Sequence, residues 1–152
     1  MQITRETDYA IRSIYYLAER FGKTASISQI SENTSVPVDF LAKILQKLAK
    51  TGIVKSHRGV KGGFGLAKQP SQITFLDAME AIEGPVAMNV CALDQKLCSL
   101  SSSCVIHPVW IEVRKEVRKL LASRNFAQVL KAQRLDIGCL EQIEPEKSHK
   151  AR

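Results

Sequence analysis

The chain has 152 residues, 45% of them hydrophobic and 24% charged, which suits one soluble globular domain with a small appendage. Its 22 Lys and Arg residues outnumber 15 Asp and Glu residues, and the net charge of +7 favours a polyanionic partner. A transmembrane helix is excluded because no stretch approaches about 18 uncharged apolar residues. Charged residues between Arg5 and Arg12 exclude an N-terminal secretory signal. We therefore expect a cytoplasmic protein with reduced cysteines and no membrane partner.

Three helices are predicted at the N-terminal end. Apolar residues at helical spacing predict a first helix that ends near Gly22. Ser26 and Gln29 have the spacing of a capping box, so a short second helix follows. After a break at 35–37, a third helix carries Asp39 in its first turn and closes at Gly52. The residues expected to face the core are Ala10, Ile11, Ile14, Leu17, Ala18 and Phe21 in the first helix, Ile27 and Ile30 in the second, and Phe40, Leu41, Ile44, Leu45 and Leu48 in the third.

A β-hairpin is predicted directly after the third helix. Residues 53–58 and 64–68 have the composition of strands, and the glycine-rich segment 59–63 is typical of the turn between them. Two short helices joined by a brief turn and followed by a hairpin indicate a winged helix-turn-helix. The hairpin is the wing.

A fourth helix completes this first domain. Thr74 and Asp77 have capping-box spacing, and Gly84 with the following proline stops the helix. We expect a mainly α fold with a small β-hairpin wing, in which residues 1–84 form a DNA-binding domain.

The remainder predicts a loop, a long helix and a tail. Residues 85–107 appear irregular, and Pro108 suits the first position of a long helix. A narrow apolar stripe of the coiled-coil kind predicts dimerisation through this helix, and the alternative is that the stripe packs on the first helix as ordinary core. Residues 108–133 would hold this helix and a short last helix capped by Asn125, before a polar, partly disordered tail at 134–152. The stripe consists of Trp110, Val113, Val117 and Leu120.

Positive charge concentrates in the third helix and the hairpin. Between Phe40 and Leu76 there are seven basic residues and no acidic residue, whereas residues 1–39 hold four basic and five acidic residues. Surface lysines are often only a solvated face, but here they coincide with the winged-helix pattern. A recognition helix enters the major groove, and a wing places cations against flanking phosphates. We assign these roles to Lys43 and Lys47 on the helix and to Arg58 and Lys61 on the hairpin.

Several short motifs, in the right order, resemble those of the bacterial Rrf2 family of regulators, which includes IscR, NsrR and RirA. The similarity covers roughly residues 1–130. It implies a winged-helix homodimer that binds near-palindromic operators in double-stranded DNA, with the long C-terminal helix as the dimer interface. The motifs are Thr7-Asp8-Tyr9-Ala10, Phe40-Leu41-Ala42-Lys43-Ile44-Leu45, Gly52-Ile53-Val54-Lys55-Ser56, Lys61-Gly62-Gly63-Phe64 and the run from Ile73 to Gly84.

Base recognition departs from the resemblance. IscR-like members have Ser and Glu side chains at positions held here by Pro37, Asp39 and Ala42, so their operator sequence does not carry over. The full set of DNA-binding residues that we expect is Ser28, Asp39, Lys43, Lys47, Arg58, Lys61 and Gly62.

Three of the four cysteines lie within fourteen residues. The intervals Cys91-x6-Cys98-x5-Cys104 match no paired zinc knuckle, whereas thiolates gathered in a flexible loop suit an iron–sulfur cluster. The alternative is three unrelated cysteines.

The family resemblance gives this loop a role. Cluster-binding members carry three cysteines here, although their first interval is more commonly five residues than six. The resemblance implies His107 as the fourth ligand, as in IscR-like members, or Asp8 of the partner subunit, as in NsrR-like members. We favour His107 and a 2Fe–2S over a 4Fe–4S cluster, and we interpret Cys139 as incidental.

The sequence therefore predicts a transcriptional regulator, a repressor by expectation, whose operator affinity depends on an iron–sulfur cluster. The signal would be iron–sulfur or iron status, nitric oxide or redox stress. The alternatives are a regulator of the same fold that senses thiol oxidation or zinc, and an iron–sulfur electron-transfer protein. No nucleophile–base constellation or nucleotide loop is present, so we expect neither an enzyme nor a small-molecule substrate.

Overall fold

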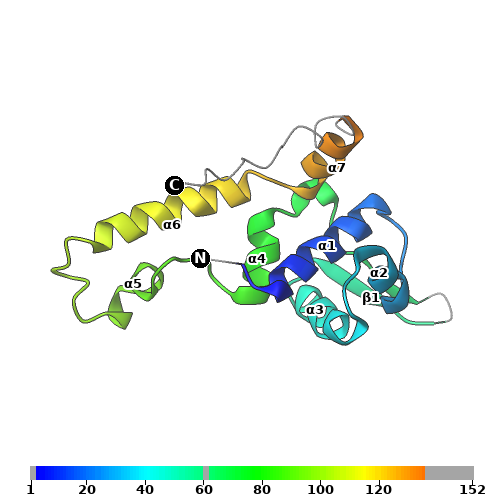
Figure 1. Cartoon of the computed structure of the whole chain (residues 1–152), viewed down its shortest axis with the longest axis horizontal. Helices are drawn as coiled ribbons and strands as arrows, with labels where there is room; N and C mark the ends of the chain where they lie inside the picture. The colour runs from blue at the N-terminus through cyan, green and yellow to red at the C-terminus, as the bar shows by residue number, and fades with distance from the viewer. Residues whose placement is uncertain (1–2, 60–61, 136–152) are drawn as a thin grey trace, which may run out of the picture.

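The computed structural model describes residues 3–59 and 62–135, and the predicted mainly helical fold with a β-hairpin wing is confirmed. Figure 1 shows the first four helices and the hairpin packed together at one end, with a long helix extending from them. None of the described helices is long and apolar enough to span a membrane. The elements are α1 (Arg5–Glu19), α2 (Ile27–Thr34), α3 (Val38–Lys50), β1 (Val54–His57), β2 (Gly63–Leu66), the 3-10 helix η1 (Pro70–Gln72), α4 (Phe75–Glu83), α5 (Val90–Leu93), the 3-10 helix η2 (Gln95–Leu97), α6 (His107–Ala122) and α7 (Phe126–Leu135).

The core lies between α1 and α3, as the helical periodicity predicts. Ile14 and Leu17 of α1 are completely buried, and so are the four apolar residues of α3 at 41, 44, 45 and 48. Ile11 and Ile27 are half-buried against the core, and two other expected core residues are exposed. Phe21 is 48% exposed because α1 ends two residues earlier, and Phe40 is 52% exposed because it projects beside α1, edge-on to Tyr9 at 5.8 Å between ring centroids.

The predicted helix caps are present. Ser26 and Gln29 form a reciprocal capping box at α2, and Thr74 and Asp77 form another at α4. Each box satisfies two backbone donors that a helix start otherwise leaves without partners. These local bonds place the starts of both helices where the sequence predicts them.

The wing is fastened to the segment before α2. In the antiparallel hairpin Val54 pairs with Leu66 and His57 with Gly63, and Phe64 also exchanges two backbone hydrogen bonds, of 2.9 and 2.8 Å, with Ala25. A Cβ at Gly63 would lie 2.4 Å from the Ala25 carbonyl oxygen, so only glycine permits this close approach. The wing therefore has a fixed base.

The chain returns to the core after α6. Phe126 at the start of α7 is completely buried, and its ring stacks on that of Phe75 with 5.0 Å between centroids. Asn125 and Gln128 cap this helix reciprocally, as expected for Asn125. The polar tail predicted from residue 134 lies, from residue 136 onward, outside the described residues.

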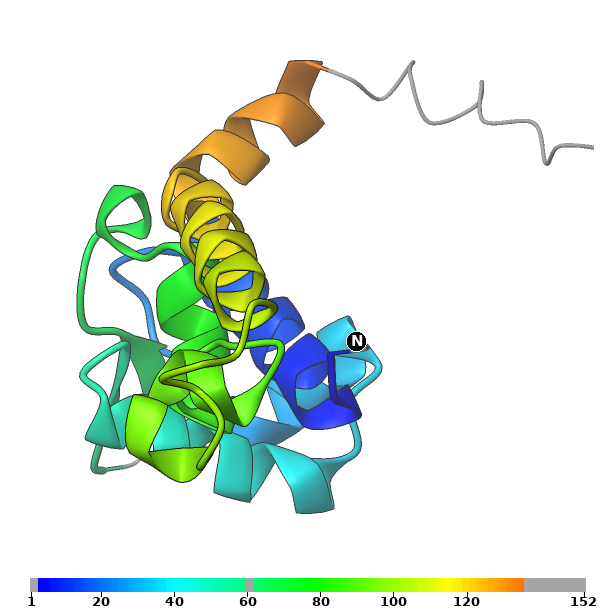
Figure 2. The same cartoon turned by 90° about the vertical axis from the view of Figure 1, so that its left-hand side faces the viewer.

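The cysteine-containing segment is more regular than expected, because it holds α5 and η2. In addition, α6 begins at His107 and places Pro108 at its second rather than its first position. No residue of α6 is fully buried, and the helix packs mainly against α4 and α5. Figure 2 views the molecule from the end at which α5 and the start of α6 lie.

A carboxylate joins the ends of α1 and α4. Glu83 Oε1 accepts hydrogen bonds from Thr7 Oγ1 at 2.5 Å and from the backbone N and Oγ1 of Thr4, both at 3.0 Å. These bonds, that from Thr7 foremost, hold the pKa of Glu83 below its ordinary value although partial burial opposes them. A carboxyl group whose pKa is lower in the folded than in the unfolded protein stabilises the fold. This contribution is complete at pH values above the unfolded-state pKa, and it disappears as the pH falls through the folded-state pKa.

Thr7→Val should raise the pKa of Glu83 towards its ordinary value, because the largest stabilising hydrogen bond is lost. NMR titration of the Glu83 side chain measures this change directly. We also expect the wild type to exceed the variant in free energy of unfolding at neutral pH, and the difference to shrink as acid protonates Glu83 in both proteins. An unchanged Glu83 pKa would contradict the assignment.

Candidate nucleic-acid interface and cysteine loop

Helix α3 presents a charged face to solvent. Asp39 and Lys43 are exposed on it, and Ser28 of α2 is exposed as well. Lys47 differs, because its ammonium forms a 2.7 Å ion pair with Glu6 of α1 and its side chain is half-buried. Lys43 is therefore freer than Lys47 to meet a phosphate.

The wing adds a second cationic element. Arg58 follows β1 and is exposed, while Lys61 lies outside the described residues. A Cβ at Gly62 would lie 2.5 Å from the His57 carbonyl oxygen, and the Gly62 N–H donates to the Gly59 carbonyl at 2.8 Å. This close approach requires glycine at position 62, so the backbone geometry by itself accounts for the residue type. The contact of Gly62 with DNA stays a prediction.

Sequence periodicity missed a hollow beside the recognition helix. A cavity of about 300 Å³ is lined by Glu6 of α1 and by Asp39, Phe40 and Lys43 of α3. The sequence did not predict this hollow, because Phe40 was expected to be buried in the core. The hollow opens on the face that carries Lys43.

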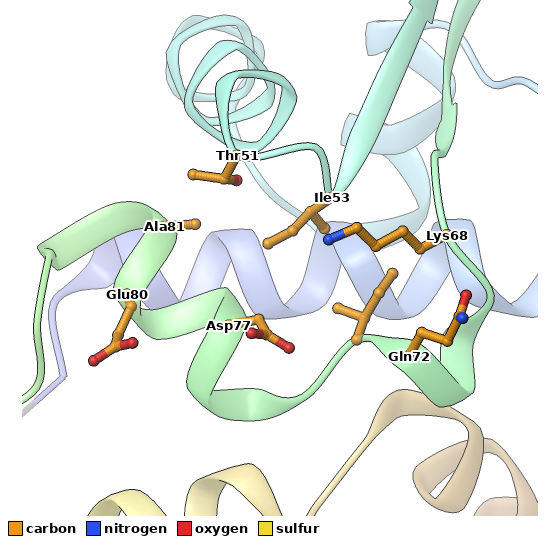
Figure 3. Close-up of a pocket in the computed structure, with 8 residues that line it drawn as sticks. Thr51, Ile53, Lys68, Gln72, Asp77, Glu80 and Ala81 are labelled. Carbon is orange, nitrogen blue, oxygen red and sulfur yellow. The ribbon is translucent and has the colours of Figure 1, made fainter.

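A second cavity, of about 220 Å³, lies behind the recognition helix, where α3, the start of β1 and α4 meet. Figure 3 shows Lys68 and Asp77 at this pocket, whereas the Glu80 carboxylate points away from Ile53 toward the side on which α6 lies. Glu80 is thus available to the long helix.

The three cysteines lie on the segment that joins α4 to α6. Cys91 of α5 is buried, and Cys98 and Cys104 are half-buried. Ser101 organises the bend between these two, because its hydroxyl donates to the Gln95 and Cys98 carbonyls at 2.6 and 2.8 Å. In the described part of the chain, no three His, Cys, Asp or Glu side chains lie close enough to hold one metal ion.

The two candidate fourth ligands differ in their surroundings. The Nδ1 atom of His107 is buried and has no hydrogen-bond partner among the described residues. Asp8 is 41% exposed and forms a 2.9 Å ion pair with Arg12, one turn along α1. A buried nitrogen without a partner is unfavourable in an ordinary core, so the position of His107 calls for a ligand or another function.

Two arginines of α6 connect it with the rest of the chain, and the sequence pattern identified neither as a functional residue. Arg114 donates to the backbone carbonyls of Val86 and Ala92, at 3.1 and 2.9 Å. Arg118 forms a hydrogen-bonded ion pair with Glu80. No local pattern signals these contacts, because the partners lie 22 to 38 residues away.

The expected dimer stripe is only partly free. Trp110, Val113 and Val117 are half-buried by their own chain, whereas Leu120 is 60% exposed. The unpartnered apolar face of α6 is shifted around the helix and consists of Val109 and Leu120, beside Val113, together with Ile106 directly before the helix.

Comparison with known proteins agrees with this architecture. Residues 3–132 match the Rrf2 family, described as an iron-dependent transcriptional regulator. The chain belongs to the Rrf2 family. It is thus a winged-helix regulator of transcription that binds DNA.

Individual relatives of this Rrf2 protein support the assignment. A protein of Aquifex aeolicus, provisionally named an HTH-type transcriptional regulator, is 32% identical over 80% of this chain and 86% of its own. The structure of T. potens IscR is similar over the whole chain and 93% of its own, with 25% identity and a TM-score of 0.68. CymR, titled the global cysteine regulator of B. subtilis, is similar over 85% of this chain and 95% of its own, with 25% identity and a TM-score of 0.69.

Lys43→Gln should weaken binding to duplex DNA of any sequence, because it would remove one of the expected phosphate contacts. Fluorescence anisotropy over a range of salt concentrations should show the slope of log K against log salt reduced by about one unit. The exposed α6 residue Lys115, changed to Gln, provides the charge-matched control and should leave the slope unchanged. Loss of preference at a single base pair, without a change of slope, would contradict the phosphate role.

Proposed function

We propose that this protein is a homodimeric repressor whose operator affinity is set by an iron–sulfur cluster bound by Cys91, Cys98, Cys104 and His107. The observation that carries the proposal is the buried, unpartnered Nδ1 of His107 at the end of a loop with three thiols. Soft thiolates and a neutral imidazole are suitable iron ligands. When bound, the cluster supplies iron that responds to oxidants, nitric oxide or iron supply.

His107 is favoured over Asp8 by its position on α6. It precedes Arg114 by seven residues, about two helical turns, so the two side chains share one face of the helix. Arg114 contacts the Ala92 carbonyl directly beside Cys91, which places His107 on the face of α6 that meets α5. Asp8 instead already has Arg12 as a partner.

Cluster binding requires the loop to rearrange, since no three candidate ligands in the described residues are gathered around one point. Cys98 and Cys104 lie on the part of the loop with little regular structure, whereas Cys91 is fixed on α5. The cluster would draw the two half-buried thiols towards the buried one. Of the two cluster types, we favour 2Fe–2S over 4Fe–4S.

A second candidate is thiol- or zinc-based sensing on the same fold. The ungathered thiols and the likeness to CymR, which is titled a cysteine regulator, favour its thiol-based form, whereas zinc would require the same gathering of ligands as a cluster. It keeps the DNA-binding surface and changes only the chemistry of the loop. Electron transfer alone would not need the cationic wing.

Dimerisation would use the unpartnered apolar face of α6. Ile106, Val109 and Leu120 are each at least 52% exposed and follow one side of the helix at spacings of three and eleven residues. A second copy would cover this face and set two recognition helices about one turn of DNA, or a multiple of it, apart. A near-palindromic operator fits such two-fold symmetry.

Protein purified without oxygen should show visible sulfur-to-iron absorption, with iron and acid-labile sulfide near stoichiometry. Cys98→Ala should abolish the absorption and remove the difference in operator affinity between cluster-loaded and cluster-free protein. Cys139→Ala, a change outside the described residues, is the matched control and should retain both. The operator is the duplex that the wild type enriches from a random pool. A colourless protein that resists reconstitution yet binds DNA would refute the cluster and leave thiol or zinc sensing.

Leu120→Glu should convert the dimer to a monomer without unfolding it, because Leu120 is largely exposed within its own chain. Light scattering after gel filtration measures the mass. Lys119→Glu introduces the same group on the adjacent exposed position and should remain dimeric. Val117→Glu is less informative because Val117 is half-buried by its own chain. A dimeric Leu120→Glu variant would show that α6 is not the interface.

A further inference from the structure

Arg114 and Arg118 lie one turn apart on α6 and connect it with two other parts of the chain. The Arg114 guanidinium donates from Nε to the Val86 carbonyl and from Nη1 to the Ala92 carbonyl. Arg118 binds Glu80 of α4, and the same Glu80 oxygen accepts the backbone N–H of Val86 at 3.1 Å. The contacts form one continuous network from α4 through α6 to α5.

The Arg114 contacts act on a segment that cannot hold its own conformation. Helix α5 has four residues, too few for a helix to be stable in isolation. Its Ala92 carbonyl is fixed by Arg114, and Val86 at the other end of the segment is fixed by the same side chain. A planar guanidinium can bind two carbonyls at fixed geometry, which a lysine ammonium at the end of a flexible stem cannot reproduce.

Cys91 is the cysteine nearest to this network along the chain. It is 8% exposed and directly precedes Ala92, whereas Cys98 and Cys104 lie beyond the fixed part of the loop and are half-buried. We propose that Arg114 is a positioning residue for Cys91, holding its thiol against α6, and that the Glu80–Arg118 pair transmits displacement of this unit to the DNA-binding domain.

The second part of the proposal follows from packing. Helix α4 contacts both α6 and the recognition helix α3. Glu80 faces α6 from the α4 side, as Figure 3 shows, so a shift of α6 pulls on α4 through an ion pair whose side chains are only about one-third exposed. This part rests on the proposed function, because it needs the loop to change state.

The first experiment measures thiol accessibility in the reduced, cluster-free protein. Iodoacetamide alkylation of each cysteine is followed by peptide mass spectrometry in the wild type, Arg114→Gln, Arg114→Lys and Lys115→Gln. We expect Arg114→Gln to accelerate Cys91 alkylation about tenfold through local opening, with Cys98 and Cys104 changed less than about twofold. Arg114→Lys should be intermediate, and Lys115→Gln should match the wild type.

Two outcomes would overturn the positioning role. One is an unchanged Cys91 rate in Arg114→Gln. The other is equal acceleration at all three cysteines together with a lower unfolding midpoint, which would mean general loosening. Because Arg114→Lys keeps the charge and most of the bulk, its intermediate rate at Cys91 alone identifies the paired carbonyl contacts even if Arg114→Gln folds poorly.

The second experiment tests transmission. Operator affinity is compared between loaded and cluster-free protein for the wild type, Glu80→Gln, Arg118→Gln and the double variant. We expect each single variant to reduce the wild-type affinity ratio at least about threefold, and the double variant to reduce it no further. If the losses of the two single variants added in the double variant, or if the affinity ratio were unchanged, transmission through the Glu80–Arg118 pair would be overturned. If the wild type itself binds no cluster, the proposed function fails, while the alkylation result at Cys91 still decides the role of Arg114.

Discussion

Burial of the apolar face of α1 is the constraint on which the rest of the structure depends. Helices α2, α3, α4 and α7 and strand β2 all contact α1. Thr7, Ala10, Ile14 and Leu17 are completely buried within these contacts. Because the recognition helix and the returning helix α7 share this one support, the DNA-binding surface and the base of the long helix are parts of the same packed unit.

Helix α6 follows a different principle. It buries no residue completely. Trp110, Val113 and Val117 are half-buried, and polar contacts also position the helix, because Arg114 binds two carbonyls and Arg118 binds Glu80. Polar contacts of this kind are easier to shift than a close-packed core, whose side chains have no free volume. In the proposed mechanism, a loop that changes state on ligand binding moves α6 and, through the Glu80–Arg118 pair, shifts α4, while the residues around α1 stay buried.

Local signals in the sequence were the most informative about the fold. The capping boxes at Ser26 and Thr74 and the apolar stripe of α3 predict helices that the structure contains, because each depends on residues three or four positions apart. Phe40 has the same periodicity as its buried neighbours yet projects beside α1, since α3 turns that edge away from the core. Lys47, in line with the other lysines of α3, pairs with Glu6 for a similar long-range reason.

The candidate site also combines features that local sequence signals predict with features that depend on long-range contacts. The three cysteines and the cationic helix and wing could be identified from residue types and spacing, since donor chemistry and charge belong to the side chains themselves, and His107 from the family resemblance. Three properties required the folded chain: the buried Nδ1 of His107, the contact of Arg114 beside Cys91, and the apolar face of α6 shifted towards Ile106 and Val109. Each depends on how α6 lies against α4 and α5, and that arrangement is set by contacts between residues far apart in the chain, which no local pattern encodes.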